Sequence, residues 1–378
     1  MAVAPAWDEL QWRRAPAVAA IHGISPWLSG RLRWAGPSQW QQFLAQQWQH
    51  TNQRFQGIES LRRRIDHEAR RRRLGLVALK GIALHDLALY RPGERPMADI
   101  DLLIRERDLS AASELLATLG YVEVTCNRRE RVFAPLNAAE PTGFGEHARN
   151  PIKIDLHTHV AEQLPVQSVD ITELLLPDPG VAGLQGYATR ATLMTHLLLH
   201  AAGNMRARSL RMIQLNDIAA LAGRLESPDW EQVLAHERRF GCRWTYPPLA
   251  LTSRYFRGVI PADVLTEAAG NCPPGLRRAS GRQRLSDVSL SNSWIEFCPG
   301  IEWCGSLAEK LRFARGRAFP AAEVRAEMRT CESTETWARA SPWFALSRAQ
   351  RVIRWIFSRP QRVATMWSIR TALQESPP

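Results

Sequence analysis

The segment RPMADIDLLI, residues 95–104, decides the fold of this chain. Its apolar residues alternate with polar ones over half a dozen positions, which predicts a β-strand with one buried face. The same alternation places Asp99 and Asp101 next to each other on the opposite face. Two neighbouring carboxylates repel each other and are costly to desolvate, so a strand that carries both predicts a compensating cation nearby.

A phosphate-binding turn is predicted upstream of this strand. The segment LVALKG, residues 76–81, is a short apolar strand that ends in Lys80 and Gly81, and a helix of about two turns follows it. Backbone N–H groups at the start of a helix can bind a phosphate, and Lys80 can add a positive charge. Arg95 has two interpretations, a contact with phosphate oxygens or an ion pair that holds the carboxylates in place.

A second acidic strand is predicted downstream. After a helix and a β-ribbon between residues 107 and 136, the segment IKIDLHTHV, residues 152–160, alternates strictly and places Asp155 and His157 on its polar face. If this strand neighbours the first, three carboxylates meet. Oxygen ligands of this kind suit Mg²⁺ or Mn²⁺, and such ions can stabilise the attacking and leaving oxygens of a phosphoryl displacement. We expect His159 to be structural.

The order of elements predicts an α+β fold. A long helix is expected from Ser38, with that residue as its cap. We divide the chain into an N-terminal helical region (1–74), a small mixed-sheet core (75–165) and a large helical domain (166–378).

Composition restricts the class of protein. The net charge of +12 favours anionic partners, and the segment LRRRIDHEARRRRLG, residues 61–75, contains seven arginines that form either a solvated helix face or an anion-binding surface. The six cysteines show no zinc-binding spacing, so we interpret them as reduced thiols of a cytoplasmic protein. No apolar run is long enough for a transmembrane helix, which needs about 18 residues.

The ordered set of motifs resembles a known family. The stretch from residue 79 to residue 121 is similar to the signature of an uncharacterised bacterial nucleotidyltransferase family within the DNA polymerase β-like superfamily. The resemblance places Lys80 and Gly81 at the superfamily's Gly-Ser position, without the serine hydroxyl. It matches Asp99 and Asp101 to the paired metal-binding carboxylates. Two further matches lie on the later strand, namely Asp155 as the third carboxylate and His157 as the histidine that follows it.

The helical part carries a weaker likeness. His200, Arg211 and Asp217 match a His…Arg…Asp pattern of that family, and we expect them to form a buried network between helices rather than to contact substrate. The segment LRFARGRAFPAAEVRAEM, residues 311–328, resembles the family's C-terminal piece. The basic amphipathic segment at residues 351–367 is expected to pack as an ordinary helix rather than to bind a membrane surface.

The resemblance implies a metal-dependent transfer of a nucleoside monophosphate, with ATP the expected donor, to an acceptor hydroxyl. Relatives in biosynthetic gene clusters, including those for lasso peptides, suggest a modified peptide, a small metabolite or a protein as the acceptor. Two alternatives stay open. One is transfer to tRNA or another RNA, as in a toxin-like component. The other is a non-catalytic nucleotide-binding module.

Overall fold

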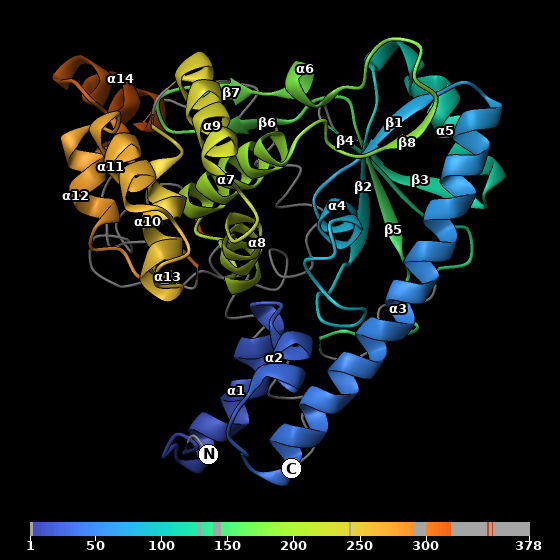
Figure 1. The fold of residues 1–378 in the computed structure, drawn as a ribbon, viewed down its shortest axis with the longest axis horizontal. Coiled ribbons are helices and arrows are strands. Elements are labelled where there is room, and N and C mark those ends of the chain that lie inside the picture. The colour runs from blue at the N-terminus through green and yellow to red at the C-terminus, as the bar shows by residue number, and fades with distance from the viewer. Residues whose placement is uncertain are drawn as a thin grey trace.

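The chain folds around one mixed β-sheet, which helices cover on both faces (Figure 1). The computed structural model describes residues 3–126, 130–138, 145–241, 243–289, 300–318, 346, 347 and 350. Within these residues, the main sheet has six strands in the order β3-β4-β5-β2-β1-β8. The strands are β1 (Gly75–Ala78), β2 (Asp99–Leu103), β3 (Tyr121–Cys126), β4 (Glu130–Pro135), β5 (Lys153–His157) and β8 (Gly183–Gln185).

One face of the sheet packs against two helices. The long α3 (Ser38–Arg71) and the shorter α5 (Leu109–Thr118) cover the apolar residues that alternate along the central strands. Ile100 and Leu102 of β2 and Ile154 of β5 are at most 1% exposed in this core. The alternation predicted for the acidic strands is therefore confirmed for Ile100, Leu102 and Ile154, which lie in one layer, whereas Leu103 at the end of β2 faces the opposite side.

The other face looks toward the helical part of the chain. Val77 of β1 and Leu103 of β2 belong to a core that they share with the buried helix α7. The polar residues of β2 and β5 project from this same face. The helices of this part are α6 (Thr172–Leu175), α7 (Arg190–Ala207), α8 (Met212–Ala222), α9 (Ser227–Phe240), α10 (Tyr246–Tyr255), α11 (Ala262–Gly270), α12 (Pro274–Ser280), α13 (Leu285–Val288) and α14 (Leu307–Ala318).

Several shorter elements complete the described chain. The N-terminal helices α1 and α2 pack against the start of α3 around Trp40, next to Trp12 and Phe43. A two-stranded ribbon, β6 and β7, follows β5. The bounds are α1 (Glu9–Ile21), α2 (Ser25–Arg31), α4 (Gly81–Asp86), β6 (Ala161–Gln163), β7 (Ser168–Asp170), and the 3₁₀ turns η1 (Glu106–Asp108) and η2 (Ile301–Trp303).

The structure bears out the α+β prediction and corrects three details. Strand β8 pairs in parallel with β1, so one strand of the sheet comes from beyond the predicted boundary at residue 165. Its three residues are too short to show a period, and Asp66 of α3 fixes it by accepting a hydrogen bond from the Leu184 N–H at 2.8 Å. Helix α3 begins at Ser38, but Pro37 is its N-cap and no side chain caps it. Helix α4 begins at Gly81 itself rather than after it, and its six residues make slightly less than the two turns expected.

Two further expectations concern the whole chain. Along the described residues, no helix is both long and apolar enough to cross a membrane. Cys272 and Cys304 are buried and free, which agrees with the expectation of reduced thiols for these two. The amphipathic segment at residues 351–367 and most of the similarity predicted for residues 311–328 lie outside the described residues.

Candidate active site

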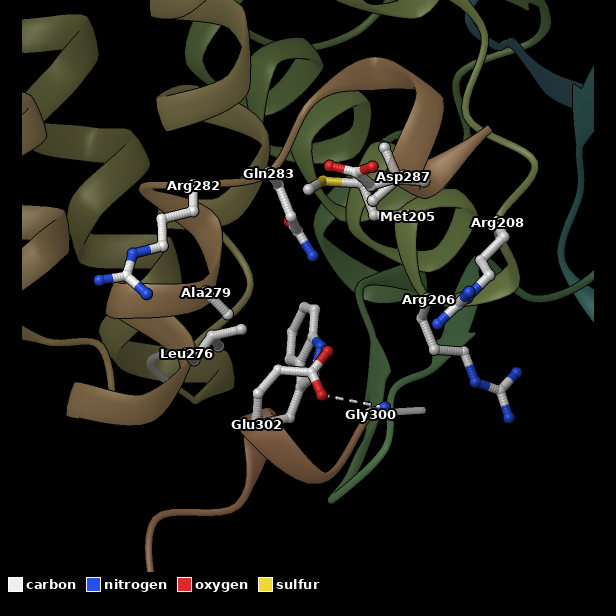
Figure 2. Close-up of a pocket in the computed structure, with 12 residues that line it drawn as sticks. Met205, Arg206, Arg208, Leu276, Ala279, Arg282, Gln283, Asp287, Gly300 and Glu302 are labelled. Atoms are coloured by element: carbon white, nitrogen blue, oxygen red, sulfur yellow. Dashed lines mark hydrogen bonds between the residues drawn. The ribbon is translucent and has the colours of Figure 1, made fainter. Parts of the chain in front are cut away.

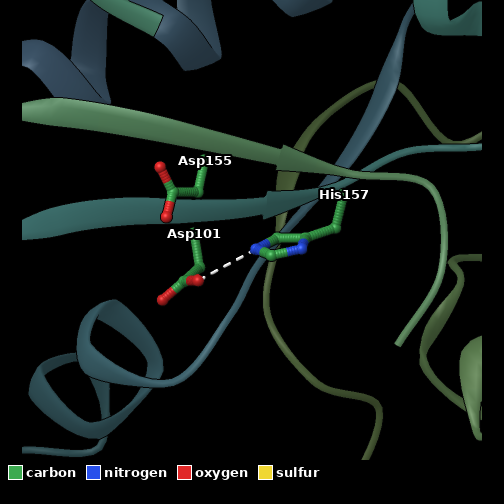
Figure 3. Close-up of side chains that lie close together, drawn as sticks. All are labelled: Asp101, Asp155 and His157. Atoms are coloured by element: carbon green, nitrogen blue, oxygen red, sulfur yellow. Dashed lines mark hydrogen bonds and ion pairs between the residues drawn. The ribbon is translucent and has the colours of Figure 1, made fainter. Parts of the chain in front are cut away.

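The two acidic strands lie side by side in the sheet. Strands β2 and β5 run parallel, and their register pairs Asp101 with Asp155 and Asp99 with Lys153. Because paired residues of neighbouring strands project from the same face, the carboxylates of Asp101 and Asp155 stand together. Figure 3 shows both of them next to the ring of His157. One ligand atom from each of these three side chains lies within 4.8 Å of the other two.

Asp101 is held by two donors on a single oxygen. The Lys80 Nζ and the His157 Nε2 each lie 3.0 Å from its Oδ1. Burial alone would raise the pKa of Asp101, but the Lys80 charge and the His157 hydrogen bond hold that pKa well below its usual range. Asp101 is therefore ionised wherever the protein is folded near neutral pH.

Asp99 shows the opposite shift. Burial, and then the charge of Asp101, raise the pKa of Asp99 above its usual value, although the charge of Lys80 partly opposes this. The paired carboxylates thus differ in proton affinity, because the Lys80 ammonium forms its ion pair with Asp101. A divalent cation at this place would favour the ionised form of both.

Lys80 lies at the turn from β1 into α4. Its backbone has φ 45° and ψ −106°, a conformation that side chains other than glycine rarely adopt. Gly81 follows because this turn passes too close to its surroundings for a side chain. A Cβ at Gly81 would lie 2.7 Å from the Met97 Sδ and 2.8 Å from the Arg95 Nη1. The structure therefore explains the Lys-Gly pair by local geometry as well as by charge.

Two residues that the sequence analysis missed support this turn. The hydroxyl of Tyr187 accepts a hydrogen bond from the Lys80 backbone N–H at 3.1 Å. The same hydroxyl lies 2.6 Å from the Nδ1 of His196, a buried residue of α7. Burial, followed by the charge of Lys80, lowers the pKa of His196 well below its usual value, so the ring is neutral and can accept the tyrosine proton. No sequence motif marks either residue, because they come from the loop after β8 and from α7, both distant along the chain from Lys80.

Arg95 forms a structural ion pair, but with Asp217 rather than with the paired carboxylates that it was expected to hold in place. Its Nε and Nη2 each donate to the Asp217 carboxylate at 2.8 Å. The Tyr90 hydroxyl also donates to Asp217, at 2.7 Å, and accepts from the Asn216 amide at 2.8 Å. Asp217 is only 2% exposed. This buried group joins the loop before β2 to α8 of the helical part.

A second buried arginine supports the acidic strands from the other side. Arg54 of α3 donates to the carbonyl oxygens of Met97 at 3.0 Å and Ala98 at 3.1 Å, directly before β2. It also donates to the Asn150 carbonyl before β5, and its Nε lies 3.0 Å from the Glu146 carboxylate. One side chain thus fixes the entry to both strands. The sequence signal was present, since Arg54 stands at helical spacing among the buried residues of α3.

The His…Arg…Asp pattern of the helical part does not form the predicted network. His200 Nδ1 lies 3.1 Å from the Glu162 carboxylate, and its Nε2 lies 3.0 Å from the Asn204 amide. Arg211 instead donates from its Nε to the Ile21 carbonyl at 2.9 Å. Asp217 pairs with Arg95, as described above. His200, Arg211 and Asp217 therefore each contact a different segment of the chain. The residues tie the helical part to its surroundings rather than to one another.

The donor set of the acidic strands fits a hard divalent cation. Two carboxylates from adjacent strands meet on one face, and a third, Asp99, projects from that face one pleat away. Mg²⁺ and Mn²⁺ prefer oxygen ligands of this type, and the imidazole of His157 is a ligand that Mn²⁺ also accepts. The cation that compensates these charges in the structure is the ammonium of Lys80. The cluster is therefore a candidate site for a divalent metal.

A pocket elsewhere in the molecule is lined by residues other than those of the acidic cluster. It has a volume of about 320 Å³ and lies between α7, α12 and the turn η2, with Leu276, Trp303 and Arg282 among its lining residues (Figure 2). Glu302 accepts a hydrogen bond from the Gly300 N–H at its edge. None of the residues of the acidic cluster lines it.

Comparison with known families agrees with this geometry. The model of a family described as an uncharacterised nucleotidyltransferase matches residues 8–256. The chain belongs to this family. Comparison with curated proteins gave no match. The matched segment includes both acidic strands, the turn at Lys80 and the helices α7 to α9, so the sheet and the first part of the helical region belong to one family unit.

Membership of a nucleotidyltransferase family carries two consequences. The protein is a transferase by family, and its expected donor is a nucleoside triphosphate. The acidic cluster is a candidate site for the divalent metal that nucleotidyltransferases generally use. The fold and family expected from the motif around Asp99 are thereby confirmed.

Proposed function

We propose that this protein transfers a nucleoside monophosphate from ATP to a hydroxyl group of an acceptor and releases pyrophosphate. The register that pairs Asp101 with Asp155 carries the proposal, because it brings the carboxylates of two separate motifs onto one face. The family match supports the same class of reaction over most of the described chain. Asp99, Asp101 and Asp155 are the proposed catalytic residues.

The same three carboxylates would hold Mg²⁺ or Mn²⁺. When bound there, the cation supplies Lewis-acid polarisation of the phosphate oxygens and offsets the charge that develops on the leaving group. The protein contributes a fixed and partly buried arrangement of ligands, since Asp101 and His157 are only 12% and 13% exposed. Lys80 and His157, both beside Asp101, would contact the phosphate groups of the donor.

The chemical step is an in-line displacement at the α-phosphorus. Asp155 orients the acceptor hydroxyl and takes its proton. The acceptor oxygen then forms a bond to the α-phosphorus, while the bond from that phosphorus to the oxygen bridging the β-phosphate breaks. Pyrophosphate leaves with the electron pair of that bond, and Lys80 offsets part of its charge. Most of the acceleration comes from positioning and electrostatic stabilisation.

The acceptor is proposed to be a modified peptide, a small metabolite or a protein. The acidic face of the sheet looks toward the helical part, which would shape the acceptor site. Relatives in biosynthetic gene clusters, including those for lasso peptides, motivate this class of acceptor, as does the sequence resemblance. A tRNA acceptor and a non-catalytic nucleotide-binding module are the alternatives that the experiment must separate.

The arginine-rich end of α3 gives little support to an RNA acceptor. Arg70 pairs with Asp66 at 3.0 Å and Arg71 pairs with Glu68 at 2.9 Å, in both cases within one turn of the same helix. Arg62 pairs likewise with Glu59 at 3.0 Å. These acidic partners offset three of the seven arginine charges, which favours the interpretation of this segment as a solvated helix face over that of a phosphate-binding surface.

A transfer assay tests the proposal. The purified protein is incubated with each α-labelled nucleoside triphosphate, Mg²⁺ or Mn²⁺, and one of three acceptor samples: the protein itself, total tRNA or a cell extract. We expect label on a peptide or small molecule with the wild type and none with Asp101→Asn. Asp263→Asn, which changes an exposed carboxylate of α11, is the matched control and should retain full activity.

The outcomes separate the alternatives. Label on tRNA that falls steeply with salt would replace the proposed acceptor with RNA. Full transfer by Asp101→Asn would remove the proposed mechanism. Metal-dependent nucleotide binding without transfer to any acceptor sample would favour the non-catalytic module.

A further inference from the structure

The backbone of Lys80 is held in an unfavourable conformation by a contact from outside the sheet. Its φ of 45° lies in the left-handed region, where a residue other than glycine is strained. The Tyr187 hydroxyl accepts the Lys80 N–H and therefore stabilises this backbone directly. Strain of this kind persists only where the surroundings maintain it, and it concentrates at functional sites.

The direction of the hydrogen bonds follows from the donors. Because the Lys80 N–H donates to the tyrosine oxygen, the hydroxyl proton of Tyr187 is free to point at the Nδ1 of His196, 2.6 Å away. His196 is 3% exposed and lies on α7, a helix whose residues are mostly buried. Tyr187 is thus fixed from the helical part, and the strained turn of Lys80 is fixed through it.

The strained turn places the Lys80 ammonium next to Asp101, a candidate metal ligand. Lys80 Nζ lies 3.0 Å from the Asp101 Oδ1, and the pair is largely buried, with side chains 23% and 12% exposed. The same oxygen also receives His157 Nε2 at 3.0 Å. Lys80 and a divalent cation therefore compete for this carboxylate oxygen, because the ammonium and His157 already occupy its hydrogen-bonding positions.

We propose that Tyr187 and His196 are positioning residues that hold the Lys80 ammonium on Asp101 as a stand-in for the catalytic cation when no nucleotide is bound. The inference rests on the proposed function, because it takes Asp101 as a metal ligand. Metal alone then binds weakly, for it competes with a tethered ammonium. A triphosphate offers that ammonium a new partner, so nucleotide and metal favour each other's binding.

Binding of Mn²⁺ alone, followed by the electron paramagnetic resonance signal of free Mn²⁺, tests the inference without any activity. Two variants remove the ammonium: Lys80→Met keeps most of the side-chain length, and Lys80→Gly also suits the positive φ. Tyr187→Phe keeps the ring and removes the hydroxyl. Tyr255→Phe is the matched control, because the Tyr255 hydroxyl accepts a backbone N–H from Leu285 at 3.0 Å, far along the helical part.

The expected results form a pattern. Both Lys80 variants should bind Mn²⁺ about tenfold more tightly than the wild type. Tyr187→Phe should shift the affinity in the same direction by a smaller factor, and Tyr255→Phe should leave it unchanged. In a Lys80→Met background, Tyr187→Phe should add nothing, because Tyr187 acts through Lys80. A thermal unfolding curve for each variant verifies that it is folded.

Three results would overturn the inference. The first is Mn²⁺ binding that Asp101→Asn abolishes, while both Lys80 variants keep the wild-type affinity. This result would leave the proposed function intact. The second is an equal effect of Tyr187→Phe with and without Lys80, which would show that the tyrosine acts independently. The third is the absence of Mn²⁺ binding in all proteins, which would overturn the proposed metal site as well.

Discussion

Replacing Arg54 with Met should lower the free energy of unfolding by about 3–5 kcal/mol, the usual cost of breaking a buried ion pair from one side. The side chain is 3% exposed, and its partner Glu146 is 19% exposed at 3.0 Å. Three backbone carbonyls, those of Met97, Ala98 and Asn150, would also lose a charged donor. These contacts fix the chain directly before β2 and β5, the strands that carry the acidic residues. Transfer activity should therefore fall along with stability.

A second substitution tests the cause. Adding Glu146→Gln removes the carboxylate that Arg54→Met leaves unpaired, and should recover about 1–2 kcal/mol of the loss. Burial already raises the pKa of Glu146, while the Arg54 charge opposes the rise, so the pKa should climb further in Arg54→Met. The folded state then takes up a proton more readily than the unfolded one as the pH falls. The deficit should therefore be smaller at pH 5 than at pH 8.

The assay is urea unfolding followed by tryptophan fluorescence at both pH values. Arg238→Met is the matched control, since Arg238 pairs with Glu267 at 2.7 Å with both side chains about half exposed. We expect this surface variant to cost less than about 1 kcal/mol. A loss for Arg54→Met no larger than that of the control, or a deficit independent of pH, would refute the reasoning.

Three further predictions concern buried groups. Burial raises the pKa of Glu237 from its usual 4.5 to about 7, so stability is lost as the pH rises between these two values, and Glu237→Gln should stabilise the protein by about 2–3 kcal/mol at pH 8 but give no gain at pH 4.5 in urea unfolding. Burial, and then Arg211, lower the pKa of His22 to about 4. The unfolded chain therefore binds a proton first, the melting temperature should fall between pH 6.5 and 4, and His22→Gln should flatten that fall. Asp217→Ala should cost about 3–5 kcal/mol, measured by the same unfolding assay, because it leaves Arg95 buried without its bidentate partner. A smaller loss in Asp217→Ala than in the Arg238 control would contradict this assignment.

The sequence predicted the acidic strands well because their signal is local. Alternation at period two placed Asp99 and Asp101 on one face, and the same rule placed Asp155, so the structure had only to make the strands neighbours. Gly120, with φ +85°, lies two residues beyond the end of α5, and the turn it allows there is likewise a local property of the backbone.

The supporting contacts were not predictable in the same way. Tyr187 reaches Lys80 across 107 positions of the chain, and Asp217 reaches Arg95 across 122. Such pairings depend on how the helical part packs on the sheet, and no periodicity encodes that. Strand β8 was missed for a related reason, since three residues carry no measurable period. Arg54 could have been found, because a charge at helical spacing among buried residues predicts a buried partner.

The central claim is that the acidic cluster transfers a nucleoside monophosphate. The most direct test compares ATP labelled at the α-phosphorus with ATP labelled at the γ-phosphorus, using the wild type, Asp101→Asn and Asp263→Asn with Mg²⁺ and a cell extract. The account predicts that the α-label moves to the acceptor and the γ-label leaves as pyrophosphate, in the wild type and Asp263→Asn alone. Transfer of the γ-label to the acceptor, or equal transfer by Asp101→Asn, would contradict it.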